Sequence, residues 1–325
     1  MTVVTYRQAI TRGIADALAA DDDVFLFGED VARAGGAFKT TDGIWERFGD
    51  ERVMDTPIAE QAIVGTAIGA AIRGLRPLAE VMFADFAAVC FDGIVNELAK
   101  YRYMTGGQVT CPVTIHMANG AGTGFAAQHS QPAENWFLNT PGLKVVVPAT
   151  VTDAYALMRA SVEDDDPVLY FEHKGLFGMR GELPDEVPPV RLGVAEVVRT
   201  GETVTVVATQ QMRHRALRAA EQLAGEGIDV ELIDPRTLVP FDHDTVRASV
   251  EKTNRLVVVQ EGSAGASWGG TLITHVLQEG FELLDAPPRL VCSEETPVPY
   301  AGSLEALWLP SVERIVEETR WIARY

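Results

Sequence analysis

The chain has 325 residues, 47% of them hydrophobic, which is typical of a soluble globular protein and long enough for two domains of ordinary size. No stretch of about 18 apolar residues occurs, so no membrane span is expected. Met1–Arg7 lacks the layout of a signal peptide, and we therefore expect a cytoplasmic protein. The net charge of −19 argues against partners such as nucleic acid or anionic membranes. It either attracts a basic protein partner or only keeps the chain soluble.

Helices and buried strands alternate through the first half of the chain. Apolar residues at helical spacing predict a helix over Arg7–Ala20, and the apolar run Val24–Phe27 predicts a buried strand. The alternation favours a parallel α/β sheet. The other strands expected here are Leu78–Met82, Pro112–Met117, Leu143–Val147 and Val168–Phe171. The other helices expected are Ile58–Arg73, Asp85–Met104 and Thr152–Glu163.

Glycines and prolines between residues 177 and 200 interrupt this pattern and predict a linker. A second α/β set follows it. Its expected strands are Thr203–Ala208, Val230–Ile233, Leu256–Val259 and Leu290–Cys292, and its expected helices are Met212–Ala224, Asp244–Glu251, Gly270–Gln278 and Val312–Ala323. The sequence therefore predicts an α/β protein of two doubly wound domains, residues 1–188 and 189–325.

Glu60 is the first candidate for chemistry. Thr56 is suited to cap a helix and Pro57 to occupy its first position, which places Glu60 one turn inside. A carboxyl group among small apolar neighbours suits proton exchange near neutral pH. The alternative is that Glu60 only complements the helix dipole.

The glycine-rich segment Asn119–Gln131 is the second candidate. Its spacing is not that of a phosphate-binding loop. His129 lies there in a polar setting, where a histidine exchanges protons or holds a polar substrate; an ordinary surface loop is the alternative. Glu29, at the end of the first strand, is a weaker candidate, and His116 is taken as structural or surface.

No spacing of cysteine and histidine predicts a metal site in this chain, and the three cysteines are expected to be buried reduced thiols. The acidic segment Val162–Asp166 offers oxygen ligands to a monovalent cation such as K⁺, but a solvated acidic loop is the simpler interpretation.

Several separated motifs, in order, resemble the β subunit of the E1 component of 2-oxo acid dehydrogenase complexes, within the transketolase-like superfamily. The resemblance covers essentially the whole chain. The segments that carry it are Phe27–Val31, Asp55–Glu60, Ala84–Phe86, Asn96–Tyr103, Gln128–Gln131, Pro141–Pro148 and Asp234–Pro240.

The resemblance implies a pyrimidine-binding domain followed by a transketolase C-terminal domain, with thiamine diphosphate bound between two different subunits. Glu60 matches the glutamate that hydrogen-bonds a nitrogen of the aminopyrimidine ring, and Phe86 matches the aromatic residue stacked near that ring. Glu29 matches a carboxylate beside the cofactor. His129 matches a histidine near the substrate and the incoming lipoyl group.

The family binds the diphosphate and its Mg²⁺ through a Gly-Asp-Gly motif followed by an asparagine, and the nearest string here is Thr41-Asp42-Gly43, with no suitable asparagine after it. The resemblance therefore implies that an E1 α subunit holds Mg²⁺, in an α2β2 heterotetramer. The family's second domain contacts other subunits and the lipoyl-bearing E2 core.

Two departures lie near the expected substrate side. His116 stands where the family often has arginine, and Pro132-Ala133-Glu134 replaces the usual Ser-Pro-Glu. Tyr101–Gly107 and Phe171–Lys174 look more like pyruvate or acetoin members than branched-chain ones. A split transketolase subunit and a non-catalytic assembly subunit are the alternative functions.

Overall fold

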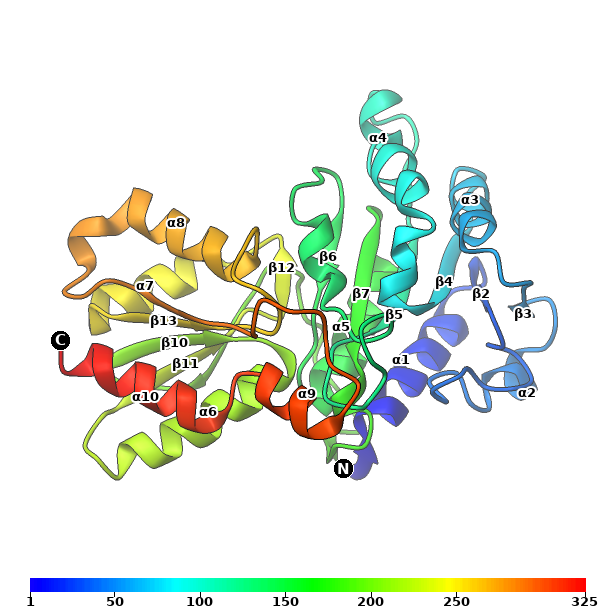
Figure 1. Ribbon diagram of the computed structural model, residues 1–325. Coiled ribbons are helices and arrows are strands. Elements are labelled where there is room, and N and C mark those ends of the chain that lie inside the picture. The colour runs from blue at the N-terminus through cyan, green and yellow to red at the C-terminus, as the bar shows by residue number, and fades with distance from the viewer. The chain divides into compact units, whose positions relative to one another are not determined.

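The computed structural model describes every residue from Met1 to Tyr325, and the chain folds into two compact units (Figure 1). The first unit comprises Met1–Asn119 and Trp136–Leu192, and the second comprises Gly120–Asn135 and Gly193–Tyr325. The domain limits at residues 188 and 189 stay a prediction. None of the helices has both the length and the apolar character needed to cross a bilayer.

The first unit is built on a parallel sheet whose strands run in the order β6-β7-β5-β4-β2-β3. These strands are β2 (Val24–Gly28), β3 (Val53–Asp55), β4 (Arg76–Phe83), β5 (Thr114–Asn119), β6 (Lys144–Val146) and β7 (Val168–His173). The α-helices are α1 (Tyr6–Ala20), α2 (Ile44–Phe48), α3 (Glu60–Ala71), α4 (Tyr101–Met104) and α5 (Val151–Glu163). Short 3₁₀ helices cover Ala133–Phe137 (η3) and Lys174–Leu176 (η4).

The second unit contains a five-stranded sheet of order β14-β13-β10-β11-β9, parallel except for β9 at one edge. Its strands are β9 (Glu196–Arg199), β10 (Val204–Ala208), β11 (Val230–Asp234), β13 (Leu256–Val259) and β14 (Arg289–Val291), with β12 at Thr237–Val239. Its helices are α6 (Gln210–Ala224), α7 (His243–Thr253), α8 (Trp268–Gly280), η5 (Phe281–Leu283), α9 (Gly302–Trp308) and α10 (Val312–Ala323). The expectation of an α/β protein with mainly parallel sheets is confirmed.

Helix α1 packs closely against α5 in the first unit. Gly13 makes this approach possible, because a Cβ atom there would lie only 3.1 Å from both Met158 Cβ and the Tyr155 carbonyl oxygen. The core beneath the two helices includes Ile10, Ile14 and Leu157, all fully buried. Apolar burial at this density is what makes the sheet rigid enough to hold charged groups in place.

The long helix expected over Asp85–Met104 is wrong. The segment contains a 3₁₀ helix, η1 (Ala84–Ala88), a π-helical turn, η2 (Gly93–Leu98), and the short α4. The Ala99 N–H bonds to the carbonyl of Ile94, five residues back. Gly93 lies against α3, where a Cβ atom would be 3.0 Å from Val64 Cγ1, so tertiary packing changes the helical period here.

The start of α3 also differs from expectation. The Thr56 N–H donates to the carbonyl of Gly28 at the end of β2, so Thr56 belongs to the sheet edge and does not cap the helix. Ala59 is the N-cap residue, with no capping side chain, and Glu60 is the first residue of α3. The carboxylate therefore lies at the very start of the helix.

Part of the expected linker at 177–200 is ordered as a strand. β8 (Arg180–Leu183) pairs antiparallel with β1 (Thr2–Thr5), which was also unexpected. All but one of the residues in this pair are exposed or half-exposed. Neither strand has the apolar run that marks the interior strands.

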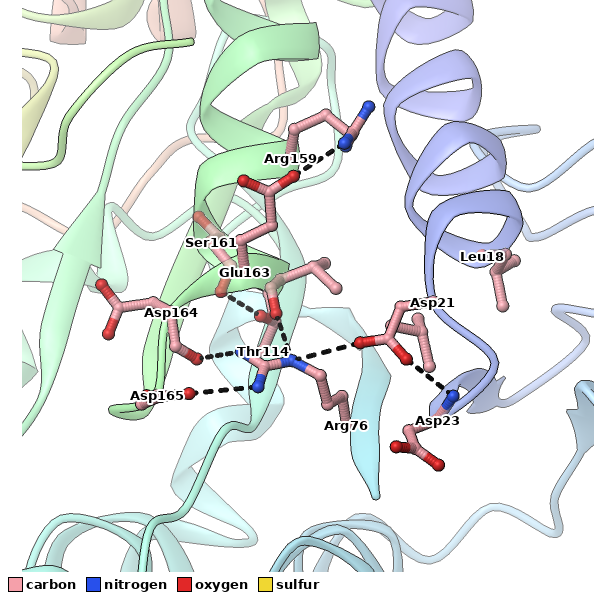
Figure 2. A network of polar contacts seen from close by, with 12 residues as sticks. Leu18, Asp21, Asp23, Arg76, Thr114, Arg159, Ser161, Glu163, Asp164 and Asp165 are labelled. Atoms are coloured by element: carbon pink, nitrogen blue, oxygen red, sulfur yellow. Dashed lines mark hydrogen bonds and ion pairs between the residues drawn. The ribbon is translucent and has the colours of Figure 1, made fainter. Parts of the chain in front are cut away.

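Arg76 joins the start of β4 to the end of α5 (Figure 2). Its guanidinium donates to the carbonyl oxygens of Val162 and Asp164, at 3.1 and 2.8 Å, and to Asp165 Oδ1 at 3.1 Å. The carbonyls at a helix C-terminus have no partner within the helix, so this side chain satisfies them. Lys144 and Arg102 also pair with Asp164 and Asp166. The alternative of a K⁺ site near this turn is not tested by these contacts.

Replacing Arg76 with alanine is expected to destabilise the first unit by about 1–3 kcal/mol, because the carbonyl oxygens at the end of α5 lose their hydrogen-bond donor. The side chain is 19% exposed. Urea denaturation of the full chain measures the effect. Arg73→Ala, at an exposed position in the turn that follows α3, is the control and leaves the urea midpoint unchanged. A midpoint for Arg76→Ala equal to that of the parent chain contradicts the assigned role.

Candidate active site

Glu29 and Glu60 approach one another at the carboxyl ends of β2 and β3. Glu29 follows β2 directly and is 5% exposed, while Glu60 opens α3 after β3 and is 7% exposed. Burial raises the pKa of Glu29, and the negative charges of Glu60 and Asp30 raise it further. The structure thus brings two of the predicted residues within electrostatic reach of one another.

Phe86 and Cys90 border the same place. Burial raises the pKa of the Cys90 thiol to about 12, and the charge of Glu60 contributes to the rise. The thiol contacts the carbonyl oxygen of Phe86 at 3.8 Å. The half-buried Phe86 ring packs edge-on against Phe83, with centroids 5.7 Å apart. Cys90 is therefore a protonated packing group, because a thiol that resists ionisation is a poor nucleophile.

His129 lies in the second unit, in the loop Gly120–Asn135, and is half-buried. Its N–H points to the carbonyl oxygen of Ala126, 3.5 Å away. Of the four residues predicted for the site, Glu29, Glu60 and Phe86 belong to the first unit and His129 to the second. The roles assigned to all four stay predictions.

Sequence reasoning missed a buried polar set on three neighbouring strands. His116 Nδ1, on β5, lies 2.7 Å from Glu172 Oε1 on β7, and His116 Nε2 lies 3.6 Å from Glu80 Oε2 on β4. The Thr40 hydroxyl donates to the same oxygen of Glu80 at 3.4 Å. A charged or ionisable residue inside each of three apolar strands was the available signal, because strands buried on both faces are normally apolar throughout.

The charges of this set depend on one another. Burial raises the pKa of Glu80 to about 7, although the charge of His116 counteracts part of the rise. Burial lowers the pKa of His116, but the charges of Glu172 and Glu80 outweigh it, so that the pKa is raised. A protonated His116 beside Glu80 and Glu172 is the arrangement that the raised pKa of His116 favours. Glu29 also acts on this set, since its negative charge contributes to the raised pKa of Glu80.

Two buried oxygen atoms near Glu60 have no hydrogen-bond partner. Glu29 Oε1 is buried and has no hydrogen-bond partner, and the same is true of Thr56 Oγ1. Buried polar atoms normally find partners, so two such atoms near one helix start fit a ligand that offers hydrogen-bond donors. A heteroaromatic ring with an amino substituent has those donors and a flat face for Phe86.

Both units match families named for transketolase. The transketolase pyrimidine binding domain matches residues 2–179, and the transketolase C-terminal domain matches residues 193–315. A solved structure titled as a split-gene transketolase, an inactive β4 tetramer, has a TM-score of 0.81 and 24% identity, and the match covers 99% of this chain and 98% of that chain. This likeness supports the fold alone.

Relatives that match nearly the whole chain are β subunits of dehydrogenases and oxidoreductases. The pyruvate dehydrogenase E1 component subunit β of Rickettsia felis is 42% identical over 322 residues, covering 99% of both chains. The β subunit of an acetoin:2,6-dichlorophenolindophenol oxidoreductase of Bacillus subtilis is 42% identical over 329 residues, covering 98% of this chain and 96% of the relative. The chain belongs to the transketolase-like family of dehydrogenase E1 β subunits, whose enzymes depend on thiamine diphosphate. The expected resemblance is confirmed.

The buried set makes stability depend on pH in a defined direction. The pKa of Glu80 is 4.5 in the unfolded reference and about 7 in the folded chain, so the folded state holds an extra proton between these values. Its contribution is present in full below pH 4.5 and is lost as the pH rises through about 7. His116, whose pKa is also raised, acts in the same direction.

Glu80→Gln, which stays neutral, is therefore expected to remove on the order of 1–3 kcal/mol of pH dependence between about pH 5 and 8. Urea titrations of the full chain across this range measure it. Glu182→Gln, at an exposed position on β8, serves as the control and retains the parent profile. Parallel pH profiles for the parent chain and Glu80→Gln rule out the assignment.

Proposed function

We propose that this chain is the β subunit of a thiamine-diphosphate-dependent E1 enzyme that decarboxylates pyruvate, or cleaves acetoin, and passes the acyl group to a lipoyl-bearing E2. The observation that carries the proposal is the buried carboxyl group of Glu60 at the first position of α3, with Glu29 in electrostatic reach. When bound, thiamine diphosphate supplies a carbon nucleophile and an electron sink for a substrate carbonyl.

Glu60 would hold the cofactor through a hydrogen bond between its carboxyl group and a nitrogen of the pyrimidine ring. Its burial keeps water from competing for that hydrogen bond. Glu29, whose pKa is raised, provides the buried acceptor Oε1 beside it. Phe86 provides an aromatic surface for the ring, and His129 holds or protonates the polar end of the substrate.

An E1 α subunit completes the enzyme in this proposal. It holds the diphosphate and Mg²⁺, since the sequence carries no Gly-Asp-Gly motif of its own. Two names among the relatives, a pyruvate dehydrogenase E1 β subunit and an acetoin oxidoreductase β subunit, support the two substrates. Their identities to this chain are equal at 42%, so pyruvate and acetoin are both tested.

Glu60→Ala is expected to lower turnover by about 10²–10⁴-fold, because it removes the carboxyl group that would hydrogen-bond the ring nitrogen. The assay combines the chain with an E1 α subunit, thiamine diphosphate and Mg²⁺, and follows CO₂ release from pyruvate or the cleavage of acetoin. Glu51→Ala, at an exposed position in the same unit, is the control and retains parent activity. Circular dichroism of both variants verifies that they fold.

Turnover equal to that of the parent chain by a folded Glu60→Ala variant contradicts the catalytic role proposed for Glu60. Turnover by the chain without any α subunit argues against the shared site. Ketol transfer between sugar phosphates, in place of acyl transfer to lipoyl groups, identifies a split transketolase. Failure to bind thiamine diphosphate with an E1 α subunit, measured by calorimetry, identifies a non-catalytic assembly subunit.

A further inference from the structure

The loop that carries His129 begins with three backbone N–H groups bound by carboxylates of the second unit. The Ala121 N–H donates to Glu261, and the Gly122 and Gly124 N–H groups donate to Glu305 at 2.8 and 3.0 Å. Glu305 lies on α9, 183 residues beyond Gly122, and is 4% exposed. Charged carboxylates accept stronger hydrogen bonds from N–H groups than neutral oxygens do, and these bonds offset the cost of burying the charge.

The backbone of the loop is shaped for this contact. Gly122 and Gly124 have φ angles of +93° and +77°, which glycine adopts without strain and which aim their N–H groups at one acceptor. Ala126 has a φ angle of +59°, an uncommon conformation for alanine, and its carbonyl oxygen faces the N–H of His129. A strained residue next to a candidate functional side chain persists only where the surroundings hold it.

The other end of the loop is also fixed to the second unit. Asn135 Oδ1 accepts a hydrogen bond from the Trp268 N–H at the start of α8, at 2.9 Å. Pro132 packs on Gly262, where a Cβ atom would lie only 2.8 Å from the proline ring. His129 therefore lies between these two attachments of the loop to the second unit.

We propose that Glu305 is a positioning residue, which fixes the Gly122–Gly124 turn and through it the side chain of His129. The inference rests on the proposed function, because the consequence for catalysis passes through His129. Glu261 supports the same turn through Ala121. The carboxylate of Glu305 acts on the loop alone and contacts no reacting atom.

The test compares Glu305→Gln, His129→Ala and the double variant in the enzyme reconstituted with an E1 α subunit. The amide keeps one oxygen but loses the charge and the second acceptor. We expect kcat/KM to fall about 10–100-fold in Glu305→Gln, because small misplacement of a catalytic group has effects of this size. In the His129→Ala background the same change lowers kcat/KM by less than about 2-fold, since coupled residues are not additive. An equal fold-loss in both backgrounds overturns the proposal.

Amide hydrogen exchange in the full chain gives a readout that does not need activity. Glu305→Gln is expected to speed exchange in the peptide spanning residues 120–131 and to leave α6 unchanged. Glu221→Ala, at an exposed position on α6, is the matched control and alters neither exchange in the loop nor kcat/KM. Unchanged exchange in the loop overturns the proposal whatever the kinetics.

The two proposals fail in distinguishable ways. If the parent enzyme turns over neither pyruvate nor acetoin, the proposed function fails, and exchange in the loop alone decides whether Glu305 fixes it. If the parent enzyme is active but Glu305→Gln is not coupled to His129, only the positioning role fails. Thermal unfolding of each variant identifies any that does not fold. If Glu305→Gln does not fold, Glu305→Asp, which keeps the charge on a shorter side chain, replaces it in the measurements of kcat/KM and of hydrogen exchange.

Discussion

Negative charge buried in an apolar interior is the constraint that organises this protein. A buried carboxylate is costly unless it finds donors or a positive partner, and three cases occur in this chain. Glu80 and Glu172 share His116, Glu305 accepts backbone N–H groups, and Glu29 keeps one buried oxygen without a partner. The third case is the exception, and it occurs beside Glu60, where a ligand with its own donors is proposed to bind.

The position of Glu60 follows from the backbone around it. The hydrogen bond from Thr56 to Gly28 extends the contact between the ends of β2 and β3, so the chain turns into α3 only at Ala59. Parallel strands bring their carboxyl ends to one edge, where α/β proteins place their functional groups. Glu80 and His116 lie deeper on the next strands and connect this edge electrostatically to the middle of the sheet.

The elements with strong apolar periodicity were predictable, and those set by tertiary contacts were not. The strands β2 and β7 and the helices α1 and α10 lie close to their expected limits, because their patterns are local. The break near Gly93 could not be foreseen, since it depends on contact with Val64. Glu29, Glu60 and Phe86 were named from motifs, but the partners of His116 come from strands that meet only in the folded sheet.

The tie between Gly122 and Glu305 also has a consequence for the newly made polypeptide. A ribosome adds about 5–20 residues per second, so the 183 residues between the two take roughly 10–40 s to emerge. During this interval the Gly122 and Gly124 N–H groups lack the carboxylate that binds them in the folded chain. These hydrogen bonds can form only after α9 has left the exit tunnel.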